Sequence, residues 1–229
     1  MILLPIGDVN PAKRFPFVNY LILAANVAIG LAMFLWMDDR AARLLVFERG
    51  FIPADWTLLD LITSQFLHGG WMHLVGNMLF LWIVGDNVED KLGHFLYPVF
   101  YLLSGVAAGL AHWGMDPHSD IPCIGASGAI SGVLAAYAVF FPRSRIRVFY
   151  AILLLVIMDW GVMEVPALLA IGFWFLQQLL YAAGSLSRLG DMQGVAYGAH
   201  VGGFVFGLVV AVFAIGFGYV RRQERPRWK

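Results

Sequence analysis

Six apolar segments divide the chain, and most of them have the length of a helix that crosses a lipid bilayer. Such a helix needs about 20 apolar residues, with a range of about 17 to 25. The segments are residues 17–37, 71–85, 95–113, 127–141, 165–183 and 195–219, of which the fourth is short. We therefore expect an all-α polytopic membrane protein. Its bundle of six transmembrane helices, residues 17–219, would stand between a tail of residues 1–16 and a basic tail of residues 220–229.

The composition agrees with this fold class and excludes several others. Of the 229 residues, 60% are hydrophobic and 13% are charged, and the mean hydropathy of +0.75 is not that of a soluble domain. The formal net charge is zero, so there is no case for nucleic-acid binding. The one cysteine, Cys123, cannot form an internal disulfide, and no Cys or His spacing indicates a metal site. We expect neither a metal nor a cofactor.

Two segments outside the six spans are less regular. The first 16 residues are polar and interrupted by prolines, and they lack a cleavable signal pattern, so we expect the first span to be retained. Residues 148–163 are apolar but carry Asp159 and lead to Glu164. We interpret them as an interfacial or re-entrant segment that leads into the fifth span. A seventh span is the alternative.

The distribution of basic residues favours six spans over seven. With six spans and the N-terminus inside, 11 of the 15 Lys and Arg residues lie on the inner side, as the positive-inside rule requires. A seventh span would move the basic C-terminal tail to the outer side. We therefore predict that both termini are cytoplasmic.

Ser127 and His200 stand where a serine nucleophile and its base are expected. Ser127 begins the fourth span between Gly125 and Gly128, which leave its hydroxyl uncovered near free N–H groups of the helix. His200 lies early in the sixth span, which has no acidic residue to orient it, so the pair indicates a Ser–His dyad. Structural roles are the alternatives: a serine in a membrane helix commonly bonds to a backbone carbonyl, and a histidine can join two helices.

His73 and Asn77 are spaced i, i+4 and so share one face of the second span. In the six-span topology they lie at the same shallow outer depth as Ser127 and His200, so one cavity can hold all four side chains. An asparagine amide and a neutral histidine are suitable donors to an oxyanion. A metal site is disfavoured, since H-x-x-x-N lacks the H-E-x-x-H pattern. The remaining histidines are expected at loops or helix ends, solvated or interfacial: His68, His94, His112 and His118.

Three motifs carry a resemblance to a known family. They read His68-Gly-Gly-Trp-Met-His73-Leu-Val-Gly-Asn77, Gly125-Ala-Ser127-Gly128, and Ala199-His200-x-x-Gly203-x-x-x-Gly207. The order and spacing of these motifs, and the helices that carry them, resemble those of the rhomboid intramembrane serine proteases. The resemblance covers about residues 19–218.

The resemblance implies a function as well as a fold. It implies Ser127 as the nucleophile, His200 as the base, and His73, Asn77 and the Ser127 N–H as oxyanion donors. It also implies a water-filled cavity open to the outer side, where a single-span membrane-protein substrate arrives sideways from the bilayer past a mobile fifth helix. That span holds the bulky residues Phe173, Trp174 and Phe175, as expected of a gate.

Two positions depart from patterns found in some members of the family. Some members have a tyrosine four residues after the nucleophile, packed on the histidine, where this chain has Ser131. How His200 is held is therefore open. Some members also have a Trp-Arg pair in the first outer loop, whereas Trp56 is followed here by Thr57.

Two other classes of protein compete with a protease. A catalytically inactive rhomboid-like protein that binds membrane helices normally lacks the serine or the histidine, and this chain has both. A transporter or channel would have charged residues within its spans or paired broken helices, whereas these spans are nearly free of charge. A chain with such short tails fits a multi-pass protein of the bacterial inner membrane.

Overall fold

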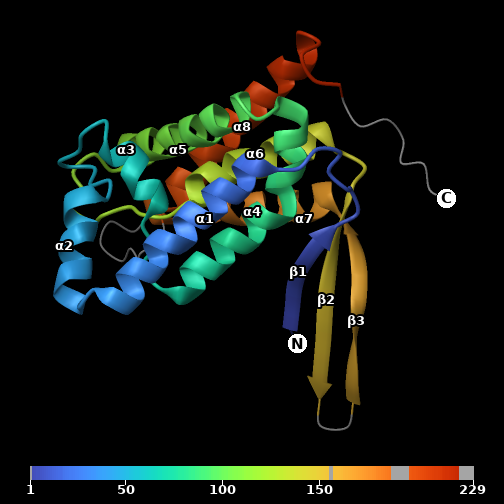
Figure 1. Cartoon of the computed structure of the whole chain (residues 1–229), viewed down its shortest axis with the longest axis horizontal. Helices are drawn as coiled ribbons and strands as arrows, with labels where there is room; N and C mark the ends of the chain where they lie inside the picture. The colour runs from blue at the N-terminus through green and yellow to red at the C-terminus, as the bar shows by residue number, and fades with distance from the viewer. Residues whose placement is uncertain (1, 155–156, 187–195, 222–229) are drawn as a thin grey trace.

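Helices make up most of the protein because apolar segments in lipid must satisfy their own backbone hydrogen bonds. The computed structural model describes residues 2–154, 157–186 and 196–221 (Figure 1). The longer helices are α1 (Phe17–Leu31), which continues into the π-helical turn η1 (Ala32–Trp36), α4 (Trp71–Leu92), α5 (Leu96–Met115), α6 (Ser127–Phe140), α7 (Ala167–Leu186) and α8 (Tyr197–Gly216). Shorter elements are α2 (Asp39–Arg49), α3 (Asp60–Thr63), the 3₁₀ turn η2 (Ser64–Phe66) and the strands β1 (Ile2–Asp8), β2 (Arg145–Leu154) and β3 (Ile157–Pro166).

Three helical segments of the described chain are long and apolar enough to cross a membrane: Phe17–Trp36, Leu96–Met115 and Tyr197–Gly216. A fourth candidate span forms if Asp60–Phe66 and α4 count as one, although these two parts meet at 96°. α6 and α7 are apolar but shorter. A mostly helical membrane protein is therefore confirmed, and the number of six spans stays a prediction.

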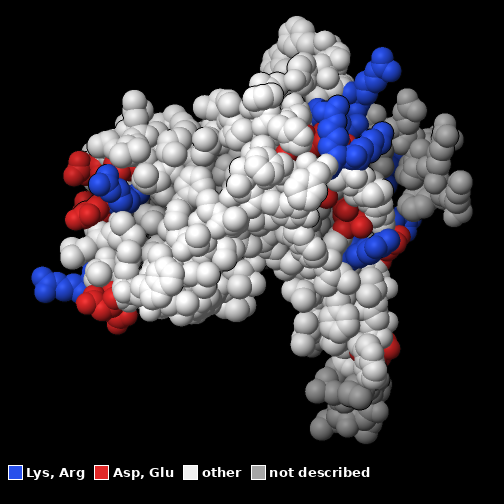
Figure 2. Space-filling view, viewed as in Figure 1, with Lys and Arg blue, Asp and Glu red and all other residues white. Residues whose placement is uncertain are grey.

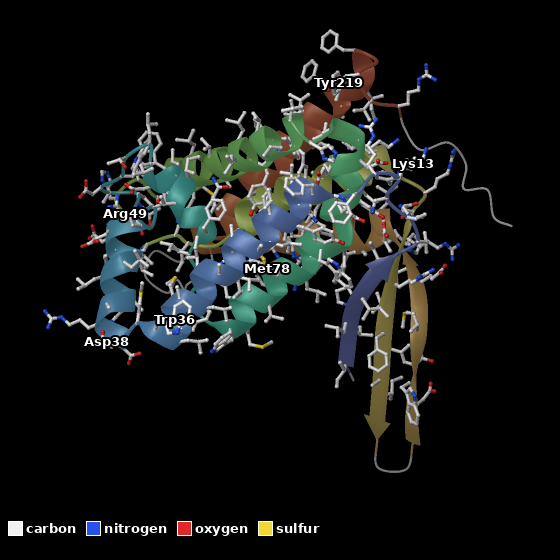
Figure 3. All side chains as sticks on the ribbon, in the orientation of Figure 1. Lys13, Trp36, Asp38, Arg49, Met78 and Tyr219 are labelled. Carbon is white, nitrogen blue, oxygen red and sulfur yellow. The ribbon has the colours of Figure 1, made fainter. Side chains whose placement is uncertain are left out.

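Charged side chains gather at the two ends of the bundle. Figure 2 shows a broad uncharged surface between one cluster at the end formed by α2 and another near the chain termini. Figure 3 labels Asp38 and Arg49 at the first end and Lys13 at the second. Because charged groups are costly within the hydrocarbon layer, this distribution aligns the bundle with its two ends in water or headgroups.

α6 lies at the centre of the bundle and packs against α4, α5 and α8. Its small side chains allow this, and Ala129, Val133 and Ala136 are completely buried. A Cβ atom on Gly207 of α8 would overlap the backbone carbonyl of Gly132, so the backbones of α6 and α8 are in direct contact. Close approach through small residues is the packing mode expected in membranes.

A three-stranded antiparallel sheet projects from the end of the bundle opposite α2, and the N-terminus lies at the far part of β1 (Figure 1). β2 and β3 form a hairpin, and β1 pairs with the outer side of β2, with Leu4 opposite Phe149. Two strands alone are marginal in stability, and the third strand gives the hairpin the support it needs.

Residues 148–163, expected to be an interfacial or re-entrant segment with a seventh span as the alternative, form strands rather than a re-entrant segment or a span, and their interfacial location stays a prediction. These residues belong to β2 and β3, apart from positions 155–156, which lie outside the described residues. β-branched and aromatic residues such as Val148, Phe149 and Ile152 favour extended structure. The N-terminal segment is likewise not only a tail, because its residues 2–8 form β1.

Asp8 joins the sheet to the bundle through a partly buried polar cluster. Its carboxylate accepts hydrogen bonds from the Tyr137 hydroxyl at 2.5 Å, from Asn87 Nδ2 at 3.2 Å and from Asn10 Nδ2 at 3.3 Å. Burial raises the pKa of Asp8 from 3.8 to about 6; the Tyr137 hydrogen bond opposes this shift and the Asp86 carboxyl adds to it.

We predict that Asp8 makes the protein less stable as the pH rises from about 4 to about 6. In this window the folded protein holds the Asp8 proton more tightly than the unfolded chain does, so stability is lost as the proton leaves. Asp8→Asn should flatten this part of the pH dependence, measured as the thermal unfolding midpoint in detergent. Asp159→Asn, at an exposed carboxyl of β3, is the control and should keep the wild-type slope. An unchanged slope in Asp8→Asn would contradict the prediction.

Candidate active site

Ser127 is the first residue of α6 and directly follows a turn at Gly125. Gly125 has φ +120°, a conformation that favours glycine, and its N–H donates to the Ser64 carbonyl at 2.9 Å. The preceding loop is held by a β-bridge in which Cys123 N–H donates to the Phe51 carbonyl at 2.8 Å. Ser127 therefore occupies a helix N-terminus, whose first N–H groups are unpaired within the helix and favour negative charge.

His200 lies in the first turn of α8, beside Ser127. The distance from His200 Nε2 to Ser127 Oγ is 2.9 Å, which is a hydrogen bond. One turn further along α8, a Cβ atom on Gly203 would overlap the backbone carbonyl of Gly128. The contact between the two backbones thus brings the serine and the histidine, 73 residues apart in sequence, into reach of each other.

Gln178 of α7 holds the other side of the imidazole. Its Oε1 lies 2.7 Å from His200 Nδ1, and the residue is only 7% exposed. An amide oxygen can only accept, so Nδ1 carries the proton and Nε2 presents a lone pair to the Ser127 hydroxyl. The Trp174 ring, one turn earlier in α7, lies 5.9 Å from the imidazole. The sequence signal that points to Gln178 is a glutamine within an apolar helix, one turn after Trp174.

His73 and Asn77 lie on one face of α4 and approach the same turn. A Cβ atom on Gly125 would press against His73 Nε2 and touch Asn77 Nδ2. Gly69 N–H donates to His73 Nδ1 at 3.4 Å, so the neutral ring carries its proton on Nε2, the atom near Gly125. Asn77 Nδ2 is buried and has no hydrogen-bond partner among the described residues. Two donors are thus available beside the Ser127 N-terminus.

A cavity of about 690 Å³ connects these groups. Its walls include Ser127, His200, His73 and Asn77, so the structure brings all four predicted residues to one space. Trp174 of α7 and several residues of α4 also line it. Phe175, in contrast, stacks on Phe204 of α8 at 4.0 Å.

Two of the histidines expected to be solvated are buried instead. His68 packs edge-on against His73 with ring centres 5.2 Å apart, and His112 lines the cavity from the last turn of α5. His68 lies in the loop before α4, so its burial depends on how that loop packs. His94 and His118 are exposed. Among the described residues, no group of three His, Cys, Asp or Glu side chains is arranged to hold a metal.

Comparison with known proteins gives one consistent result. Residues 55–217 match the Rhomboid domain. The chain is 30% identical over 208 residues to Rhomboid-like protein 11, chloroplastic, of Arabidopsis thaliana, which covers 88% of this chain and 66% of the relative. It is 28% identical over 217 residues to Rhomboid protein 1, mitochondrial, of Saccharomyces cerevisiae, which covers 90% of this chain and 56% of the relative.

A bacterial relative matches a shorter region. Rhomboid protease GluP of Bacillus subtilis is 41% identical over 76 residues, which is 33% of this chain and 14% of the relative. The chain thus spans only part of the length of each relative.

The geometry predicts that Ser127 reacts with a fluorophosphonate probe in detergent. Ser127→Ala removes the expected nucleophile and His200→Ala the expected base, so both variants should lose labelling. Ser131→Ala is the control: the Ser131 hydroxyl donates to the Ser127 carbonyl at 2.6 Å, so its loss should leave labelling in place. Labelling of Ser127→Ala at the wild-type rate would show that another residue reacts.

Proposed function

The chain belongs to the rhomboid family, and we propose that it is an intramembrane serine endopeptidase. In this proposal it hydrolyses peptide bonds in or near the transmembrane segments of single-span membrane proteins. The observation that carries the proposal is the hydrogen bond of 2.9 Å between His200 Nε2 and Ser127 Oγ, within a cavity at a helix N-terminus.

The proposed reaction proceeds through an acyl-enzyme. Ser127 Oγ attacks the carbonyl carbon of the scissile bond while His200 Nε2 accepts the hydroxyl proton. His200 then gives the proton to the leaving amine, the C–N bond breaks, and an ester remains on Ser127. A water molecule, deprotonated by His200, attacks this ester; the products are a carboxylic acid and free Ser127.

Three donors would stabilise the negative oxygen of the tetrahedral intermediate. They are the Ser127 N–H, His73 Nε2–H and Asn77 Nδ2–H, of which the last is buried and unpartnered among the described residues. A donor fixed before the reaction stabilises the developing charge without reorganisation. The role of α4 in this proposal is thus electrostatic, and it takes no part in proton transfer.

We propose a topology of six spans, formed by α1 with η1, α4, α5, α6, α7 and α8, with cytoplasmic termini. The 14 residues of α6 reach about 21 Å, less than the roughly 30 Å of the hydrocarbon layer. If α6 ends at the inner surface, Ser127 lies below the outer surface, where a cavity open to that side would supply water. The tails of residues 1–16 and 220–229 flank the domain of residues 17–219, with 222–229 outside the described residues.

Substrate access in this proposal is lateral, between α4 and α7, since both helices line the cavity. The relatives are named chloroplastic, mitochondrial and, for the protein from Bacillus subtilis, a protease. Membrane embedding is common to the family, and location in a bacterial inner membrane stays a prediction for this chain.

The test is cleavage of a single-span reporter in proteoliposomes. We expect cleavage by the wild type and none by Ser127→Ala. Asn77→Ala should lower turnover by about 10²–10³-fold, because one oxyanion donor is lost.

Asn87→Ala is the matched control for Asn77→Ala. Asn87 is a buried asparagine of the same helix, but it bonds to Asp8 and Asp86 at the opposite end of the bundle. Its loss should lower the unfolding temperature and leave turnover per folded molecule unchanged. A folded wild type that labels at Ser127 but cleaves no reporter would favour the inactive, helix-binding alternative.

A further inference from the structure

The distal part of the three-stranded sheet exposes one continuous apolar face. Residues that pair directly across antiparallel strands point to the same side, so the register assigns Ile2, Ala151 and Trp160 to one face together with Leu4, Phe149 and Val162. Four of the six are exposed, with 62% for Ile2, 45% for Leu4, 60% for Trp160 and 56% for Val162, while Phe149 and Ala151 are half-buried. We call these six residues the apolar sheet face. The opposite face also exposes the apolar side chains of Leu3, at 53%, and Met163, at 40%, but it carries the exposed carboxylate of Asp159.

Charged groups lie at the base of this same face, where the sheet meets the bundle. Arg147 is opposite Glu164 in the register, with Nε 3.8 Å from Oε1, and Arg145 NH1 lies 3.9 Å from Oε2 of the same glutamate. The three side chains are about half exposed. Figure 2 shows further basic side chains gathered at this end of the bundle. The sheet is thus apolar towards its tip and basic at its base.

Two physical limits fix the depth at which such a sheet is stable. The outer edge of β3 is unpaired by any described strand, and an open sheet edge does not occur in the hydrocarbon layer. A broad exposed apolar face is equally unfavourable in bulk water. The headgroup region satisfies both limits, and tryptophan is enriched there.

The charged base of the sheet lies between the apolar sheet face and the apolar helix α7. β3 leads directly into α7, whose first turn exposes Leu168 and Leu169. An apolar face that is joined to an apolar helix through a base with two arginines favours an anionic bilayer surface as its occupant over a second protein copy.

We propose that the sheet docks on the bilayer interface on the side of the termini. Its apolar face lies at the boundary between headgroups and acyl chains. The basic side chains at its base contact anionic phospholipid headgroups, as in other interfacial anchors.

The test uses a polarity-sensitive fluorophore on a cysteine introduced at Val162, in a Cys123→Ala background, in vesicles with nitroxide-labelled phospholipid. We expect a blue-shifted emission that shallow nitroxides quench, more strongly when phosphatidylglycerol accompanies phosphatidylcholine. Leu4→Cys samples the same face from β1 and covers the case in which Val162→Cys does not fold. Asp159→Cys, on the opposite face, is the control and should be quenched less. Quenching at Val162 and Leu4 that is no stronger than at Asp159 would overturn the proposal. A blue shift that appears only at high protein density in the vesicles and is insensitive to the nitroxides would also overturn it, because it would indicate a second copy.

A separate observation concerns Gln178, and this second inference rests on the proposed function. The glutamine comes from α7, the helix beside which the substrate would pass, yet it bonds the imidazole of α8. We infer that Gln178 is a positioning residue that couples the location of α7 to the orientation of His200. When α7 moves aside for a substrate, the His200 imidazole loses its hydrogen-bond acceptor. The hydrogen bond forms again only when α7 returns.

Gln178→Met removes the acceptor at nearly constant volume, and Gln178→Glu keeps one. We expect Gln178→Met to slow fluorophosphonate labelling and kcat by about 10²-fold with little change in KM, because the base is misoriented. Gln178→Glu should recover most of the rate and move the acid limb of the pH–rate profile to higher pH, since a carboxylate stabilises the imidazolium. His73 of α4 and His112 of α5, which also line the cavity, are unchanged in these variants.

Gln177→Met is the matched control, since Gln177 is exposed and bonds to the Tyr181 hydroxyl at 3.3 Å on its own helix. It should behave as the wild type. Labelling of Gln178→Met at the wild-type rate would overturn the inference and leave the proposed function standing. Equal loss in Gln178→Met and Gln178→Glu would reduce the residue to a structural role. A wild type that fails to label would instead overturn the proposed function.

Discussion

The contact between the backbones of α6 and α8 is the constraint on which the candidate site depends. Gly203 and Gly207 of α8 lie against the carbonyls of Gly128 and Gly132, with no side chain between them. One added methyl group must push the helices apart, because overpacking of this kind costs about 1–3 kcal/mol or forces a shift. A shift of about 1 Å is enough to lower a rate by roughly 10²-fold. In the proposed mechanism the glycines therefore affect the rate through the positions of Ser127 and His200, without contacting a substrate.

The cavity combines groups that a stable interior would avoid. Asn77 Nδ2 is buried without a partner among the described residues, and a buried unsatisfied donor costs about 1–3 kcal/mol. In the proposed mechanism this donor bonds to the oxyanion when the intermediate forms, in place of water of the open cavity. Because the donor is fixed in place beforehand, it stabilises the developing charge without reorganisation.

The parts of this protein that sequence predicts well are those coded by local patterns. Each apolar segment implies a helix by itself, and i, i+4 spacing puts His73 and Asn77 on one face. The site motifs lie at helix ends, so one topology was enough to bring Ser127 and His200 together. The sheet is not predicted from the sequence because β1 pairs with a strand more than 130 positions away. In addition, a short apolar run does not distinguish a strand from a helix. The contact of Gln178 with His200 and the burial of His68 are also not predicted from the sequence. The first depends on how α7 packs and the second on how the loop before α4 packs.

The order of the site along the chain has a consequence for biosynthesis. Ser127 is made with α6, but His200 belongs to α8, the last helix of the described chain. A nascent chain that has inserted its first helices holds a serine without a base, and such a hydroxyl is a weak nucleophile. Docking of α8 on the glycine surface of α6 completes the packing and brings the imidazole to the serine in the same event. For the proposed protease, this order means that the growing polypeptide and its neighbours at the insertion site are not cleaved before the bundle is complete.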